Sequence, residues 1–201
     1  MIEMLKEKIA YIHGYKGSPN GVSFNILSKY VNKNYKLVGI DYDEENIDID
    51  SLKLELKSLG ISKVIGSSLG GFIALNLGNE FKKMVFNPCM KPSVELPKLG
   101  APEKMVAKYT SIENTFFSNL KGDELDKATT CGFFGDSDEL FGPYGYKLLF
   151  KSYYRNAYNI KCGHKIEDSA IKKIAYRIKM FFDFENVSNV FKVIDRNLCL
   201  N

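Results

Sequence analysis

The chain has 201 residues, 45% of them hydrophobic, and a formal net charge of +4 at pH 7. This length predicts one domain, and the lysines alternate with acidic residues instead of forming the like-charged block typical of nucleic-acid binding. The N-terminus is charged where a signal peptide would be apolar, and the longest charge-free stretch, residues 64–79, is too short to span a membrane. We therefore expect a cytoplasmic protein that binds neither nucleic acid nor membranes.

The four cysteines also exclude some site classes. Cys89, Cys131, Cys162 and Cys199 lie far apart and form no C-x-x-C pair, so a zinc site or a redox dithiol is not expected. Isolated cysteines are usually buried as small hydrophobic side chains, in agreement with a reducing compartment. The sequence predicts neither a bound metal ion nor an organic cofactor.

Short apolar strands alternate with helical segments along the chain. Strands are predicted at residues 9–13, 36–40, 63–66, 84–86, 129–134 and 158–161, and helices at 51–59, 69–77, 144–154 and 167–182. Asp50 is expected to cap the first of these helices, and Gly60 to end it. The alternation predicts an α/β fold with a mostly parallel central sheet, helices on both faces and functional residues at the carboxyl ends of the strands.

Two segments depart from this alternation. Residues 88–127 are too long for a simple connection and contain four prolines with two helical patches, at residues 102–108 and 115–120. We expect this insert to form a small cap over the site. Residues 185–201 form a C-terminal extension whose apolar residues are consistent with a terminal helix. The prediction is thus a single domain, residues 1–201, with a cap insert and an extension.

A G-x-S-x-G motif follows the apolar run that ends at residue 66. Such a motif is the nucleophile elbow of α/β-hydrolases, a sharp strand-to-helix turn that exposes a serine. Here Ser68 would be the nucleophile, Gly66 and Gly70 would allow strand and helix to approach closely, and the backbone N–H of Leu69 would be one oxyanion donor. A glycine-rich turn of this kind also suits a phosphate, which is the alternative interpretation of the motif.

The loop after the first strand supplies a second candidate donor. In His13-Gly14-Tyr15, Gly14 permits an unusual backbone angle, and the N–H of Tyr15 would point into the site. We expect His13 to support this loop rather than to act as a base.

A base and an acid follow Ser68 in the order expected for this fold. The chain has two histidines, and only His164 lies after the serine. Two aspartates follow the strand at residues 129–134 and could be the acid. Asp138 is preferred because its spacing from Gly135 is better, and Asp136 is the alternative. The alternative position after the preceding strand holds Asn87 and a proline instead of an acid.

These motifs resemble those of the YqiA-like esterases, which are small bacterial α/β-hydrolases. The matching segments are Tyr11-Ile12-His13-Gly14-Tyr15 with Ser18-Pro19, Ile65-Gly66-Ser67-Ser68-Leu69-Gly70-Gly71-Phe72, Phe86-Asn87-Pro88, Phe134-Gly135-Asp136-Ser137-Asp138-Glu139 and Gly163-His164. The resemblance implies a compact hydrolase for carboxylic esters, with Ser68 as nucleophile, Asp138 as acid and His164 as base. It does not extend to the tail, and the lysine-rich insert has no clear counterpart in it.

The sequence therefore predicts a serine hydrolase that cleaves a small-molecule ester through an acyl-enzyme intermediate. Two alternatives remain. One is a thioesterase acting on acyl-CoA, whose phosphates the dispersed lysines would meet. The other is a protein with a hydrolase fold that binds a ligand without catalysis. Neither the substrate nor the oligomeric state follows from these residues, because specificity depends on the shape of the pocket.

Overall fold

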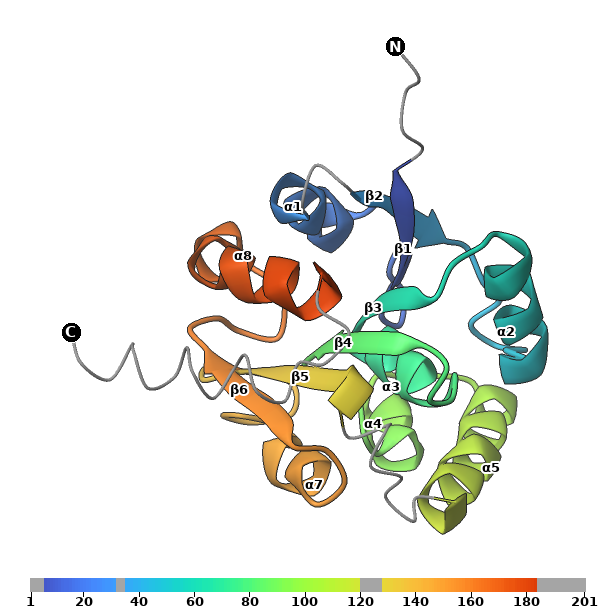
Figure 1. Cartoon of the computed structure of the whole chain (residues 1–201). Coiled ribbons are helices and arrows are strands. Elements are labelled where there is room, and N and C mark those ends of the chain that lie inside the picture. The colour runs from blue at the N-terminus through green and yellow to red at the C-terminus, as the bar shows by residue number, and fades with distance from the viewer. Residues whose placement is uncertain (1–5, 32–34, 120–127, 184–201) are drawn as a thin grey trace.

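A computed structural model describes residues 6–31, 35–119 and 128–183 (Figure 1). The described strands form one sheet in the order β2-β1-β3-β4-β5-β6, and every neighbouring pair is parallel. Their bounds are β1 Glu7–Ile12, β2 Tyr35–Ile40, β3 Lys63–Ser67, β4 Lys82–Phe86, β5 Thr130–Gly135 and β6 Asn156–Ile160. The predicted parallel sheet is confirmed.

Helices cover both faces of the sheet, as predicted (Figure 1). The bounds are α1 Val22–Tyr30, α2 Ile49–Ser58, α3 Leu69–Leu75, α4 Pro92–Lys98, α5 Glu103–Asn119, α7 Lys147–Lys151 and α8 Asp168–Asp183. Helices α1 and α8 share one hydrophobic cluster with one face of the sheet, whereas α2, α3, α4, α5 and α7 contribute to the cluster on the other face. Side chains on the two faces of the strands thus pack into two separate hydrophobic cores, as expected for a sheet buried on both sides.

Several helix boundaries differ from the prediction for local reasons. Helix α2 begins at Ile49 because the side chain of Asp48, not that of Asp50, accepts hydrogen bonds from the first N–H groups. Helix α7 is shorter than residues 144–154, because Tyr144 and Gly145 have positive φ angles of 63° and 45°. Helix α1 was not predicted.

The insert at residues 88–127 contains α4 and α5. Instead of two short patches, one 17-residue helix, α5, runs from Glu103 to Asn119. On α5, Tyr109 and Phe116 are buried against Phe72 of α3, with ring centroids 6.5 and 5.6 Å apart. The insert therefore packs on the same core as α3. Residues 120–127 and the extension at 185–201 lie outside the described residues, and the cap role of the insert stays a prediction.

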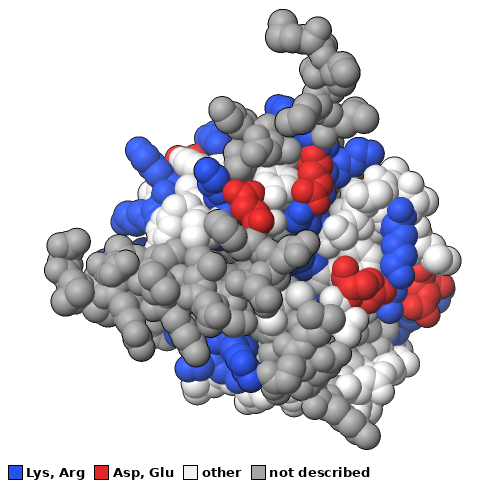
Figure 2. All heavy atoms as spheres, viewed as in Figure 1, with Lys and Arg blue, Asp and Glu red and all other residues white. Residues whose placement is uncertain are grey.

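On the face shown in Figure 2, basic side chains lie at several separate places, and acidic side chains lie among them near the top and on the right. Within residues 6–31, 35–119 and 128–183, none of the helices has both the length and the apolar character that crossing a bilayer requires.

The close contact between α3 and β1 leads to a stability prediction. A Cβ at Gly70 would lie 2.2 Å from the carbonyl oxygens of Ile12 and His13, which are backbone atoms with little freedom to move. We expect Gly70→Ala to lower the free energy of unfolding by about 3 kcal/mol, measured by urea denaturation. The control is Gly60→Ala, where φ is +68° but no atom lies within 4 Å of the new Cβ, so only backbone strain of about 1 kcal/mol is added. Equal losses for the two variants would contradict this prediction.

Candidate active site

The turn between β3 and α3 holds Ser68 in a strained backbone conformation. Ser68 has φ 54° and ψ −120°, a region that non-glycine residues rarely occupy and that costs about 1–3 kcal/mol. The strand and the helix approach so closely at this turn that a Cβ at Gly66 would lie 2.4 Å from the carbonyl oxygen of Gly70, so the turn requires glycine at this position. Ser68 is partly exposed above the otherwise buried α3. This is the geometry expected of a nucleophile elbow.

The loop after β1 lies directly against this serine. A Cβ at Gly14 would be 2.9 Å from Cβ and 3.5 Å from Oγ of Ser68, so only glycine allows the loop to come so close. The Tyr15 N–H follows Gly14, and the Leu69 N–H opens α3. Within the described residues neither N–H donates a hydrogen bond. Both N–H groups are therefore free to bind an acceptor.

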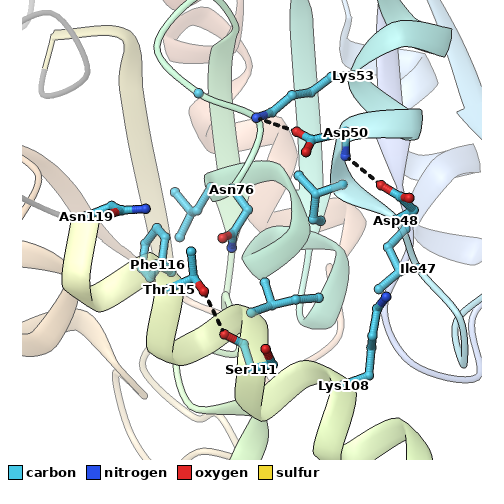
Figure 3. A pocket seen from close by; sticks show the side chains of 14 residues that line it. Ile47, Asp48, Asp50, Lys53, Asn76, Lys108, Ser111, Thr115, Phe116 and Asn119 are labelled. Carbon is cyan, nitrogen blue, oxygen red and sulfur yellow. Dashed lines mark hydrogen bonds and ion pairs between the residues drawn. The ribbon is translucent and has the colours of Figure 1, made fainter.

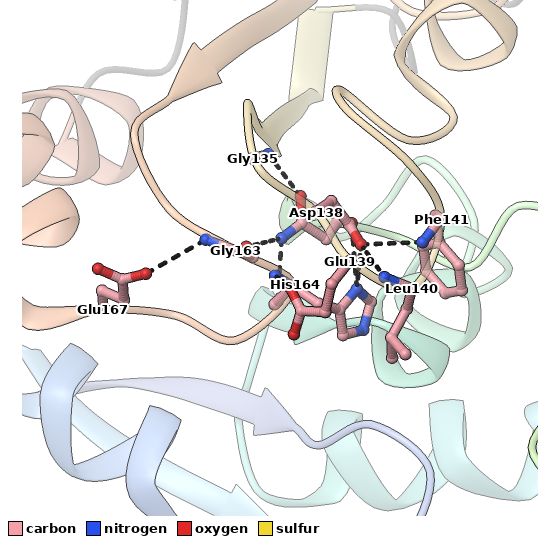
Figure 4. Close-up of polar contacts among 9 residues, drawn as sticks. Gly135, Asp138, Glu139, Leu140, Phe141, Gly163, His164 and Glu167 are labelled. Atoms are coloured by element: carbon pink, nitrogen blue, oxygen red, sulfur yellow. Dashed lines mark hydrogen bonds and ion pairs between the residues drawn. The ribbon is translucent and has the colours of Figure 1, made fainter.

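The loops after β5 and β6 bring an imidazole and a carboxylate together (Figure 4). Nδ1 of His164 lies 3.1 Å from both Oδ1 and Oδ2 of Asp138. The two residues are only 7% and 2% exposed, so water hardly screens the contact. Phe141 packs edge-on against the imidazole, with ring centroids 4.6 Å apart. These contacts fix the ring and leave Nε2 as the nitrogen that Asp138 does not engage.

Asp138, and not Asp136, is the carboxylate that contacts His164. Oδ1 of Asp138 also accepts hydrogen bonds of 2.9 Å from the N–H groups of Leu140 and Phe141. Burial raises the pKa of the Asp138 carboxyl, but the hydrogen bonds from His164, Phe141 and Leu140 together with the His164 charge outweigh it, so the pKa lies below its ordinary value. Asp136 instead accepts from the neighbouring Ser137 hydroxyl at 2.8 Å.

Ser68 is linked to the His164 loop through the end of β4. The Ser68 N–H donates to the Phe86 carbonyl at 2.9 Å, and the Ser68 carbonyl accepts from the Cys89 N–H at 3.0 Å. Asn87 lies between Phe86 and Cys89 in the sequence, and its side-chain amide donates to the carbonyl of His164 at 3.0 Å. The Ser68 hydroxyl itself makes no hydrogen bond within the described residues, although the motif order predicts one to His164. Catalytic hydrogen bonds of this kind often close only when substrate binds.

Within the described residues His13 makes no contact with His164 or Asp138, and it is only 4% exposed. Its Nδ1 lies 3.0 Å from the carbonyl oxygen of Gly14 and 3.4 Å from Oε1 of Glu44, and its ring packs on Tyr42 at 4.6 Å. The Tyr42 hydroxyl donates to the His13 carbonyl at 2.8 Å. These contacts tie the Gly14 loop to the segment after β2, consistent with the supporting role predicted for His13.

Sequence reasoning assigned no role to two further residues at this site. Oε2 of Glu139 accepts a 2.7 Å hydrogen bond from the His164 N–H, and Asn87 contacts both loops that carry the imidazole and the acid. Asn87 follows a predicted strand, and that position was a usable signal. Glu139 gave none, because a carboxylate after an acidic turn is ordinary surface chemistry.

Cys162 precedes His164 by two residues but has the properties of a buried thiol. It is 3% exposed, and burial raises its pKa to about 12, so the reactive thiolate is scarce at neutral pH. In the part of the chain that the structure describes, no three His, Cys, Asp or Glu side chains are placed to hold a metal ion.

A groove on the surface lies apart from these residues. A groove of about 600 Å³ lies between α2, the end of α3 and α5, with Asn76, Lys108 and Thr115 among its lining residues (Figure 3). The lining includes neither Ser68 nor Asp138 nor His164. The groove lies at the C-terminal end of α3, whereas Ser68 lies at the N-terminal end of the same helix. The groove is therefore distinct from the candidate site.

Comparison with known protein families identifies the family of this chain. Residues 8–140, well over half of the chain, match the family described as Uncharacterised protein family (UPF0227). The chain belongs to this family. The resemblance to the YqiA-like esterases is thereby confirmed. Among curated proteins, the comparison finds no significant match.

Several solved structures have the same fold as this chain. An esterase from Pyrococcus furiosus is 16% identical with a TM-score of 0.61, over 88% of this chain and 81% of its own. An esterase domain from Rhodothermus marinus is 12% identical with a TM-score of 0.63, over 88% and 87% of the two chains. The carboxylesterase CesB of Bacillus subtilis is 12% identical with a TM-score of 0.60, over 90% and 85%. The predicted α/β-hydrolase fold is confirmed.

The depressed pKa of Asp138 makes the stability of this site depend on pH. A carboxyl whose pKa is lower in the folded state stabilises the fold above its unfolded pKa, and this contribution is lost as pH falls through the folded pKa. We expect the free energy of unfolding, measured by urea titration from pH 6 to pH 2.5, to fall less steeply in Asp138→Asn than in the wild type below about pH 4. Parallel curves for the two proteins would show that the pKa of Asp138 is not lowered in the folded state.

Proposed function

We propose that this protein is a serine hydrolase that cleaves carboxylic esters through an acyl-enzyme intermediate. The observation that carries the proposal is the buried contact of His164 Nδ1 with the Asp138 carboxylate, 3.1 Å long, on two loops that Asn87 bridges. Phe86 and Cys89, on either side of Asn87, bond the backbone of the strained Ser68 turn. Family membership and the hydrolase fold support it. The esterase activities of the similar structures belong to those proteins and serve here as the analogy for the substrate class.

In the proposed first step, Ser68 Oγ attacks the ester carbonyl carbon while His164 Nε2 takes the hydroxyl proton. Asp138 accepts the Nδ1 hydrogen bond, keeps the lone pair on Nε2 and stabilises the imidazolium that forms. His164 then gives the proton to the leaving alkoxide as the C–O bond breaks. Water, deprotonated by the same Nε2, attacks the acyl-serine, and His164 returns this proton to Ser68 Oγ as the acyl–oxygen bond breaks and the acid is released. Every step uses protein groups and water.

The negative charge on the carbonyl oxygen would fall between the Leu69 and Tyr15 N–H groups. Within the described residues neither N–H group has an acceptor, so no existing hydrogen bond would have to break before they bind an oxyanion. Each such donor contributes about 3–4 kcal/mol to transition-state stabilisation in serine hydrolases. The same donors would also suit a phosphate, so what supports acyl transfer over phosphate binding is the His164–Asp138 contact, which a phosphate site does not need.

The proposal is tested by covalent labelling with a fluorophosphonate and by hydrolysis of p-nitrophenyl esters and acyl-CoA thioesters. We expect labelling at Ser68, none in Ser68→Ala, and turnover of short p-nitrophenyl esters. Turnover of thioesters alone would favour the thioesterase alternative. A wild-type protein that takes no label and hydrolyses neither substrate class would instead be a ligand-binding protein on a hydrolase fold.

A further inference from the structure

Asn87, the residue directly after β4, uses its whole side-chain amide to bind three backbone groups on two loops. Oδ1 accepts a 2.7 Å hydrogen bond from the Gly135 N–H at the start of the acid loop. Nδ2 donates to the carbonyl oxygens of Gly163 and His164, at 3.1 and 3.0 Å. Asn87 is 2% exposed, so neither its donors nor its acceptor have water as an alternative partner.

The two loops that Asn87 joins are in direct backbone contact. A Cβ at Gly135 would lie 2.6 Å from the Cys162 carbonyl oxygen and 2.7 Å from that of Gly163, so the acid loop fits against the histidine loop only through glycine. Close packing keeps the loops near each other but does not fix their relative position along the contact. Directional hydrogen bonds do: the Ser137 N–H donates to the Cys162 carbonyl at 3.2 Å and the His164 N–H to Glu139 Oε2 at 2.7 Å. The Asn87 amide adds three more, one to the acid loop and two to the histidine loop.

The residue type at this position follows from the same geometry. The φ angle of Asn87 is 42°, a region that asparagine tolerates better than most residues. Its side chain must donate on one side and accept on the other, which a carboxylate of equal shape cannot do. An aspartate here would face the Gly163 and His164 carbonyl oxygens with negative charge and leave both without a donor.

We propose that Asn87 is a positioning residue that sets the register of the His164 imidazole against the Asp138 carboxylate. It acts through the backbone of both loops and touches neither the substrate nor the reacting atoms. The inference rests on the proposed function for its effect on rate, but its structural content, the His164–Asp138 hydrogen bond, can be measured without any activity.

The test is Asn87→Asp, which keeps the side-chain shape and removes both donors. We expect kcat for a p-nitrophenyl ester to fall on the order of 100-fold with little change in KM, because a small misplacement of catalytic groups costs about that much. The matched control is Asn76→Asp at the far end of α3, which loses the same kind of bond, the 2.9 Å donation from Nδ2 to the Phe72 carbonyl. We expect that control to lose stability and keep kcat.

The second readout is the proton NMR signal of the His164 Nδ1–H, which a carboxylate acceptor moves far downfield. The His13→Asn variant assigns it, because the chain has only two histidines. We expect the signal in the wild type and in Asn76→Asp, and its loss or upfield shift in Asn87→Asp. If Asn87→Asp does not fold, Asn87→Gly gives the same readouts, because glycine accepts the positive φ.

The outcomes separate this inference from the proposed function. An inactive wild type that shows the downfield signal, lost on substitution of Asn87, would overturn the function and support the positioning role. An active wild type whose Asn87 variants keep both the signal and kcat, and lose only stability, would overturn the positioning role and leave the function standing.

Discussion

Replacing His164 by alanine should lower kcat for ester hydrolysis on the order of 10⁶-fold, the cost of losing the base from a serine–histidine pair that works as a unit. In the described structure the imidazole is the base candidate because Asp138 engages its Nδ1 and leaves Nε2 for the serine proton. The slow reaction that remains would come from the oxyanion donors alone. Steady-state kinetics with a p-nitrophenyl ester, together with a thermal unfolding curve that shows a folded variant, measure the effect.

The second histidine provides the control for this experiment. His13 is buried against Tyr42 and lies 3.4 Å from Glu44, so His13→Asn should weaken the Gly14 loop and reduce the rate while catalysis persists. Most of the hydrolysis surviving in His164→Ala, or the larger loss occurring in His13→Asn, would show that the base has been assigned to the wrong histidine.

The sheet and the elbow could be predicted from sequence because both leave local signals. Short apolar runs bounded by glycine indicate buried parallel strands, and G-x-S-x-G requires glycines wherever strand and helix backbones nearly touch. The structure shows this need at Gly70, where a Cβ would lie 2.2 Å from the backbone of β1. The position of Asp138 after β5 followed from the motif order and the family resemblance, whereas the order β2-β1-β3-β4-β5-β6 was not predicted.

Other features could not be predicted, because they depend on contacts between segments distant in the sequence. The single helix α5 is held by Tyr109 and Phe116 packing on Phe72, whereas the local pattern suggested two shorter pieces. The position of Asn87 directly after a strand can be read from the sequence, but its three hydrogen-bond partners lie 48 to 77 residues away along the chain. A residue that binds backbone groups leaves no pattern in the partners' side chains, so only the fold reveals it.

The two aspartates of the acid loop differ enough in their contacts to be separated by one substitution each. Asp138→Asn should reduce kcat on the order of 10⁴-fold, because an amide at this position favours the wrong imidazole tautomer and cannot stabilise the imidazolium. The amide can still accept from the Leu140 and Phe141 N–H groups, which bond Oδ1 at 2.9 Å, so the loop should stay folded.

Asp136→Asn is the matched control, because it removes one charge from the same loop two residues away. Asp136 bonds the Ser137 hydroxyl and has no contact with the His164 ring within the described residues. We therefore expect its kcat to stay within a few-fold of the wild type. A large loss in Asp136→Asn with a mild effect in Asp138→Asn would reverse the assignment of the acid. Comparable losses in both would indicate that the charge of the loop, and not a hydrogen bond to Nδ1, supports the imidazole.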